Sequence, residues 1–221
     1  LMLIVAAALT ATLGLAFQVR QVHVDGTRRF APAEVEAALQ PALGSTSLTL
    51  RATDLRSAVL EVPWVEEASV RVSLDGVVHC VIREREPVAV AIDGSAVSLV
   101  DRTGHLMGSP RGSLPELEIV DFAPFPEERA NLLVALPAIE EAAAARVRRA
   151  ARMGFCNVAL TFDQVPCPIL VDPTRPDQLR LARRVLEAWQ RDTHAAPLRL
   201  DARVGGRVAV LPAPTPTETP S

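Results

Sequence analysis

Residues 61–70, with the sequence EVPWVEEASV, mark the point at which a helical pattern gives way to a strand pattern. Before this stretch, apolar residues recur at i, i+4 and i+7 from Leu55 to Val62, which indicates an amphipathic helix. After it, apolar and polar residues alternate up to an Asp75-Gly76 turn and resume beyond it. This pattern predicts a β-hairpin directly after the helix.

The residues upstream complete a small unit of mixed helix and strand. Residues 18–25 alternate as a strand, and a short helix follows in which Val35 and Leu39 share a face. The order strand, helix, helix, strand, strand predicts a three-stranded sheet with two helices on one face. Trp64 stands between the second helix and the second strand, where we expect it to fill the core rather than to anchor an interface.

The residues after the hairpin predict a β-rich domain with flanking helices, so the fold class of the whole chain is α+β. One helix is expected to be interrupted at Pro137, a second to cover residues 138–152 and a third to open at Pro176. Residues 212–221 lack apolar bulk and are expected to be disordered. The predicted strands are residues 88–92, 96–100, 117–120, 157–162, 167–171, 198–204 and 207–211, the last two joined by a turn at Gly205-Gly206.

The N-terminal segment, residues 1–17, carries no charge. As a helix it would be about 25 Å long, close to the lower limit for a membrane span. We expect a single transmembrane anchor, although a cleaved signal peptide with a small-x-small site at Gly14 and Ala16, or a buried core helix, fits the same residues. The positive-inside rule would place the basic residues that follow this segment in the cytoplasm, unless a more basic tail precedes Leu1. Charge alone therefore does not set the orientation of the segment.

The composition excludes several kinds of chemistry. The net charge is −3 and every basic residue except the histidines is arginine, so the chain lacks the basic character of most nucleic-acid-binding proteins and has no lysine for a Schiff base or a Walker A motif. Glu84 and Glu86 alternate with arginines and are expected to form a charged strand surface. We therefore expect no catalytic residue, no metal, no cofactor, no small-molecule substrate and no nucleic-acid partner. The histidines, which lie far apart without metal-ligand spacing, are His23, His79, His105 and His194.

The three cysteines leave one question open. Cys80 falls in an apolar strand pattern and is expected to be a small buried residue. Cys156 and Cys167 flank a predicted hairpin and would pair only if their β-carbons face each other in an oxidising compartment, which the sequence does not decide.

Several segments, in a fixed order, resemble a known family. Residues 22–26 (VHVDG) resemble the opening strand of a POTRA domain, and the stretch at residues 61–70 resembles the Pro-Trp-Val segment of the FtsQ/DivIB cell-division family. Residues 84–89 (EREPVA) are similar to a further segment of that family. Additional similar segments are residues 99–104 (LVDRTG), 114–117 (LPEL) and 200–203 (LDAR). The resemblance covers about residues 1–211, although the last strand lacks the aromatic residues that are frequent in the family.

The resemblance implies a bitopic inner-membrane protein with its bulk in the periplasm at the division septum. It would comprise a transmembrane anchor at residues 1–17, a POTRA domain at residues 18–87, an FtsQ-type β domain at residues 88–211 and the tail at 212–221. Such a protein is a non-catalytic scaffold of the divisome that binds FtsB/FtsL-like division proteins. The alternatives are another POTRA-type envelope-assembly protein and a secreted periplasmic binding module with a cleaved signal peptide.

The same resemblance places the partner-binding site at the C-terminal strand, where an unpaired edge would accept a partner strand by β-augmentation. Arg203 and Arg207 would then pair with acidic residues of the partner, whereas the opposing interpretation has Val208 and Val210 only filling the core. A second surface is expected at Arg83 and Arg85 of the POTRA domain, unless these side chains are merely solvated. The residues assigned to the C-terminal site are Arg203, Val204, Gly205, Gly206, Arg207, Val208, Ala209 and Val210.

Overall fold

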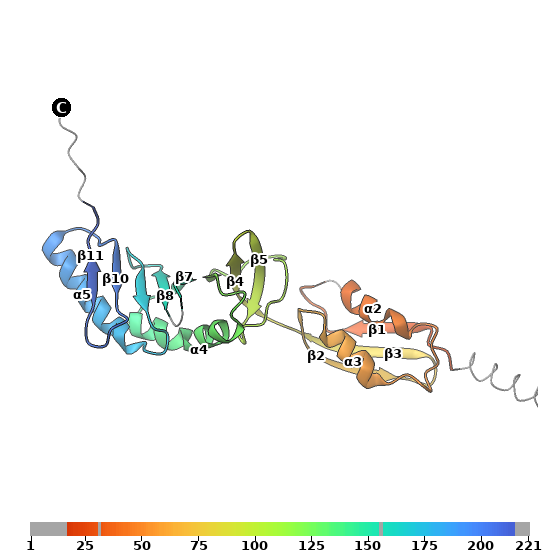
Figure 1. The fold of residues 1–221 in the computed structure, drawn as a ribbon. Helices are drawn as coiled ribbons and strands as arrows, with labels where there is room; N and C mark the ends of the chain where they lie inside the picture. The colour runs from red at the N-terminus through yellow and green to blue at the C-terminus, as the bar shows by residue number, and fades with distance from the viewer. Residues whose placement is uncertain (1–16, 31, 155–156, 215–221) are drawn as a thin grey trace, which may run out of the picture. The chain divides into compact units, whose positions relative to one another are not determined.

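A computed structural model describes residues 17–30, 32–154 and 157–214 of the chain. The described residues form two compact units that meet in sequence between Arg85 and Glu86 (Figure 1). The anchor predicted at residues 1–17 lies outside the described residues except for Phe17, as does most of the predicted C-terminal tail. Within the described ranges, none of the helices has the length and apolarity that a membrane crossing requires.

The first unit has the predicted order of elements. Its three-stranded sheet has the spatial order β1-β3-β2, in which β3 pairs parallel to β1 and antiparallel to β2. Gly26 ends β1 with φ +97°, and a β-carbon there would lie 2.1 Å from the Ile82 carbonyl oxygen, so this turn requires glycine. The elements are β1 (Gln21–Asp25), α2 (Ala33–Leu39), the short 3₁₀ helix η1 (Gln40–Ala42), α3 (Ala52–Leu60), β2 (Val65–Val72) and β3 (Val77–Glu84).

Trp64 lies in the core of this unit, as predicted. Its side chain is 2% exposed, and its ring stacks on Phe30 with ring centroids 5.1 Å apart. Its Nε1 donates a hydrogen bond of 2.6 Å to the Glu34 carboxylate on α2. The indole therefore links α2 to the residue before β2, and its N–H has a hydrogen-bond acceptor.

The second unit is an eight-stranded mixed sheet in the order β11-β10-β9-β8-β7-β6-β4-β5. The pairs β4–β6, β6–β7 and β9–β10 are parallel, and the other neighbours are antiparallel. Its elements are β4 (Pro87–Asp93), β5 (Ala96–Asp101), β6 (Glu118–Val120), α4 (Pro126–Ala143), β7 (Val147–Arg152), β8 (Val158–Phe162), β9 (Ile169–Val171), α5 (Asp177–Thr193), β10 (Arg199–Asp201) and β11 (Ala209–Leu211).

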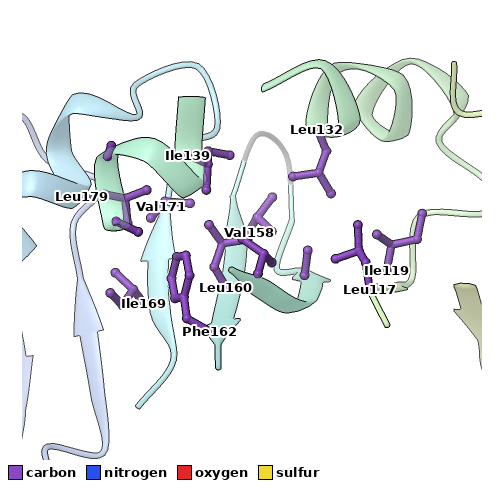
Figure 2. Packing of buried hydrophobic residues seen from close by; sticks show 14 of the residues in the cluster. Leu117, Ile119, Leu132, Ile139, Val158, Leu160, Phe162, Ile169, Val171 and Leu179 are labelled. Carbon is purple, nitrogen blue, oxygen red and sulfur yellow. The ribbon is translucent and has the colours of Figure 1, made fainter. Parts of the chain in front are cut away.

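Helices α4 and α5 supply one side of a single apolar core in this unit. Leu132 and Ile139 of α4 and Leu179 of α5 belong to the same buried cluster as Leu160 and Phe162 of β8, as Figure 2 shows. Along β8 buried and half-buried residues alternate, so only one face of this strand enters the core.

The helix predicted at residues 138–152 is wrong. Helix α4 continues through Pro137 and ends at Ala143, because Ala144 adopts a left-handed conformation with φ 51°. Residues 147–152 then form strand β7 between β6 and β8. The run of arginines there obscured the strand pattern, because Arg149 and Arg152 pair with Glu118 and Glu128 of neighbouring elements rather than lining a helix.

The structure describes two of the three cysteines, Cys80 and Cys167. Cys167 is a buried free thiol and Cys156 lies outside the described residues. Cys80 is fully buried, as predicted, and burial raises the pKa of its thiol to about 11.

Candidate partner-binding edge

Strand β11 is the end strand of the eight-stranded sheet. It pairs antiparallel with β10, with Leu200 opposite Val210 and Asp201 opposite Ala209. The Leu200 N–H donates to Pro168 on the β9 side, so the hydrogen bonds that join β10 to β11 involve the residues on either side of Leu200. By the same alternation, the N–H and C=O of Val210 point away from the sheet.

The side chains of the residues along this edge contribute to the core. Val208 and Val210 pack against the apolar core of the unit. The two interpretations of these residues are therefore compatible, since their side chains stabilise the sheet while the main chain of Val210 faces outward. Pro212, which follows β11, has no N–H and ends the pairing.

The strand predicted at residues 207–211 is shorter in the structure. It covers only Ala209–Leu211 as β11, and the residues before it, which include most of the predicted partner-binding site, form a loop. Gly206 has φ +73°, and its N–H donates 3.1 Å to the buried Gln178 side chain of α5. A β-carbon on Gly205 would lie 2.5 Å from the Arg175 guanidinium. The loop is thus held against the start of α5, which prevents a longer β11.

Arg203 has a partner within its own chain. Its guanidinium donates to both carboxylate oxygens of Asp201 on β10. The hydrogen bond from Arg203 holds the pKa of Asp201 below its ordinary value, against the opposing effect of burial. Arg207, in contrast, is exposed, and none of the ion pairs found among the described residues includes it. Of the two arginines predicted to meet a partner, Arg207 is the available one.

Exposed apolar side chains surround the edge. Leu198, Val204 and Leu211 are 53%, 63% and 44% exposed, and the first and last of these lie at the same end of the β10–β11 pair. Prediction from the sequence included Val204 but missed Leu198 and Leu211. In the sequence, Leu198 and Leu211 are apolar residues at the outer ends of two predicted strands. Core residues show the same pattern, so it did not mark these two as exposed.

The opposite end of the sheet is covered. The N–H of Met107 donates to the Leu99 carbonyl on β5, and the N–H of Leu99 donates to the Gly108 carbonyl. The buried Asp101 carboxylate accepts hydrogen bonds from the main-chain N–H groups of Thr103 and His105, which shapes the turn that brings this segment back. The chain therefore closes the β5 edge with its own residues, whereas none of residues 17–30, 32–154 and 157–214 covers the outer side of β11.

The second predicted surface is partly neutralised. Arg83 lies on β3 and forms ion pairs with Glu66 and Glu67 on β2, at 2.9 and 2.6 Å. Arg85 is half-buried just beyond β3, and its main-chain N–H donates to the Trp64 carbonyl. The two arginines therefore differ in environment, and the structure does not bring them together with the residues of the β11 edge in one unit. Among the described residues, no cluster of His, Cys, Asp and Glu has the geometry to hold a metal ion.

Comparison with known proteins connects this architecture to a family. Residues 17–85 match the family described as "POTRA domain, FtsQ-type". A segment of 106 residues is 32% identical to the cell division protein FtsQ of Rhizobium meliloti (strain 1021), and covers 47% of the chain and 34% of that protein. The chain resembles the FtsQ/DivIB family, and its first unit matches an FtsQ-type POTRA domain. The resemblance seen in the sequence is confirmed.

Two further proteins named cell division protein FtsQ are also similar to this chain. The cell division protein FtsQ of Paracoccus denitrificans (strain Pd 1222) is 30% identical over 45% of the chain and 31% of its own length. That of Rhodothermus marinus is 23% identical over 86% of the chain and 76% of its own length. The segments matched to the first two relatives span only about a third of those proteins.

Proposed function

We propose that this chain is a non-catalytic scaffold of the divisome, which binds FtsB/FtsL-like division proteins by strand addition at β11. The outward main chain of Val210, at an end of the eight-stranded sheet that no described residue covers, carries this proposal. Similarity to proteins named cell division protein FtsQ supports the biological setting.

The chemistry of the edge indicates how a partner would bind. A partner strand would form main-chain hydrogen bonds with Val210 and would lay alternate side chains beside Leu211 and the loop before β11. An acidic residue of the partner would face Arg207, because Arg203 is already engaged by Asp201. Such a rim charge sets the register of the added strand and the rate of association more than the affinity.

The location follows from the family in the same way. The anchor at residues 1–17 would hold the chain in the inner membrane, with the POTRA and β units in the periplasm at the septum. The outward edge of β11 would then be accessible to partners anchored in the same membrane.

A matched pair of proline variants tests the proposal. Val210→Pro removes the outward N–H of β11, whereas Val97→Pro places the same residue on β5 at the other end of the same sheet. We expect Val210→Pro to weaken binding of the host's FtsB/FtsL-like periplasmic segment by about tenfold or more, equal to about 1.4 kcal/mol. Biolayer interferometry measures the affinity, and a fluorescent fusion reports septal recruitment of the partner.

The Val97→Pro control separates loss of the binding edge from loss of the fold. Val97→Pro should bind the partner as the wild type does, and thermal unfolding should show both variants folded. Equal binding by folded Val210→Pro and wild type would show that β11 is not the site.

A further inference from the structure

Most of the exposed large apolar side chains of the first unit lie in two loops. Among the described residues of this unit, these side chains are Leu43, Leu48, Leu74 and Val81. The three leucines are 39%, 58% and 64% exposed and belong to the loops, whereas Val81 lies in the middle of β3. A single exposed apolar side chain is ordinary on a protein surface, but a group of them marks a contact site.

The first loop, residues 43–50, pairs with the start of the described chain. The N–H of Gly44 donates a 2.9 Å hydrogen bond to the Val19 carbonyl, and the N–H of Ser47 donates a 2.7 Å bond to the Phe17 carbonyl. An exposed leucine therefore flanks this pairing on each side. The leucine after Ser47 lies next to the contact with Phe17.

The second loop is the turn between β2 and β3, which contains Leu74. The N–H of Arg20 donates a 2.8 Å hydrogen bond to the Gly76 carbonyl, and a β-carbon on Gly76 would lie 2.3 Å from the Gln18 carbonyl oxygen. The main-chain groups of Val19 are bound to the first loop instead. The two loops therefore contact residues 17–20 on opposite sides.

The sequence places a predicted membrane anchor directly before these contacts. The anchor covers residues 1–17, which carry no charge, and its last residue is Phe17. Because the Phe17 carbonyl is already bound by Ser47, no linker separates the predicted anchor from the two loops. With the anchor in the membrane, both loops stand at the bilayer surface.

The composition of the loops suits such a surface. From Ala37 to Thr53 the sequence contains one charged residue, Arg51, and no acidic residue. In the second loop, the carboxylate of Asp75 accepts a 3.4 Å hydrogen bond from the Val77 N–H. Segments that lie in the membrane interface bury apolar side chains among the headgroups, and basic residues favour anionic lipids there.

We propose that Leu43, Leu48 and Leu74 form a membrane-contact surface, which enters the headgroup region of the bilayer that holds the anchor. The contact holds the first unit against the bilayer and restricts its rotation about Phe17. The bilayer is favoured over a protein as the occupant, because the covalent chain keeps the loops beside the predicted anchor whichever partner is bound. This inference rests on the anchor of the proposed function and does not depend on the β11 edge.

Methyl NMR of the full chain in bicelles of phosphatidylcholine and phosphatidylglycerol tests the inference. Labelling of leucine and valine methyl groups reports the three leucines and Val81 in one spectrum. We expect nuclear Overhauser effects between lipid protons and the methyl groups of all three leucines, which require direct contact. Val81 is the internal control, because it lies five residues beyond Gly76, about 16 Å along β3, and should show none. The absence of these effects at the leucines would overturn the proposal.

A double variant tests whether the leucines act as one surface. Leu48→Gln combined with Leu74→Gln should abolish the lipid contact of Leu43, whereas Val81→Gln should leave all three contacts unchanged. Thermal unfolding should show both proteins folded, because every substituted side chain is exposed. An undiminished lipid contact of Leu43 in the folded double variant would overturn the proposal.

Flotation separates failure of this inference from failure of the proposed anchor. The full chain should float with vesicles of the same two lipids after a high-salt wash. A chain that does not float overturns both the anchor and the contact, whereas one that floats without leucine–lipid contacts overturns the contact alone. Contacts between the leucines of two copies, seen in a sample of mixed labels, would assign the surface to self-association.

Discussion

At one end of the eight-stranded sheet β5 is covered by residues 105–108, whereas at the other end no residue that the structure describes covers β11. The cover depends on a polar side chain inside the protein. Arg129 of α4 is 5% exposed and donates hydrogen bonds to the carbonyl oxygens of Gly104, Phe122 and Ala123. No such buried side chain closes β11 within the described residues, where the loop is instead drawn toward α5. An edge is thus closed only where specific side chains hold the covering segment.

The largest effect should come from Trp64→Ala, which tests whether the open edge in the second unit depends on the first unit. Loss of the buried ring and of its hydrogen bond to Glu34 should destabilise the first unit by about 3–5 kcal/mol. Chemical denaturation followed by NMR should show the loss in β1–β3 only. A matching loss of stability at β10 and β11 would show that the two units fold as one.

Arg129→Met should convert the closed end of the sheet into an open one. Three carbonyl oxygens lose their donor, two of them in buried hydrogen bonds, so we expect a loss of stability of about 2–4 kcal/mol and faster amide exchange at Leu99. Arg102→Met is the control, because the Arg102 side chain is 75% exposed and its contact with Glu86 is 3.6 Å long. Unchanged exchange at Leu99 in Arg129→Met would mean that the cover holds without the arginine.

Asp201→Asn should have the smallest effect on stability and should sharpen the description of the open end. The pKa of Asp201 is depressed in the folded chain by Arg203, so the pair stabilises the protein above the unfolded pKa of Asp, about 3.9. This contribution is lost as the pH falls through the lower, folded pKa. We expect the variant to be less stable at pH 7 by under about 1 kcal/mol, and equal to the wild type in strong acid.

The same variant releases Arg203. Binding of an acidic partner segment at β11 should then increase, measured by interferometry at pH 7. Arg203→Gln is the control that removes the charge altogether. Weaker binding by Asp201→Asn than by the wild type would show that the partner needs the Asp201 carboxylate.

Local signals predicted much of the first unit. The alternation around Asp75-Gly76 and the helical spacing before Pro63 are short-range patterns, and the structure follows them from β1 to β3. Trp64 was placed in the core because it joins a helix to a strand, and its contacts with Phe30 and Glu34 agree.

In the second unit, the bounds of several elements depend on contacts between residues far apart in sequence, so the sequence did not predict them. Strand β7 is stabilised by pairing with β6 and by ion pairs such as Arg152 with Glu128, and these partners lie far from β7 in sequence. The first residue of β11 is set by the loop before it. In that loop Gly205 and Gly206 lie against Arg175 and Gln178, about 30 residues away in sequence. The cover over β5 depends on Arg129 in the same way.

The proline that follows β11 limits how far strand pairing can extend. Only Ala209–Leu211 form β11, so among the described residues of this strand Val210 alone turns its N–H and C=O outward. The N–H of Gly206 before the strand is bound to Gln178, and Pro212 after it has no N–H. One outward residue pairs with one short strand, whereas an open-ended stack of strands needs a longer template. The geometry that admits a partner therefore also protects the exposed sheet from growing into an aggregate.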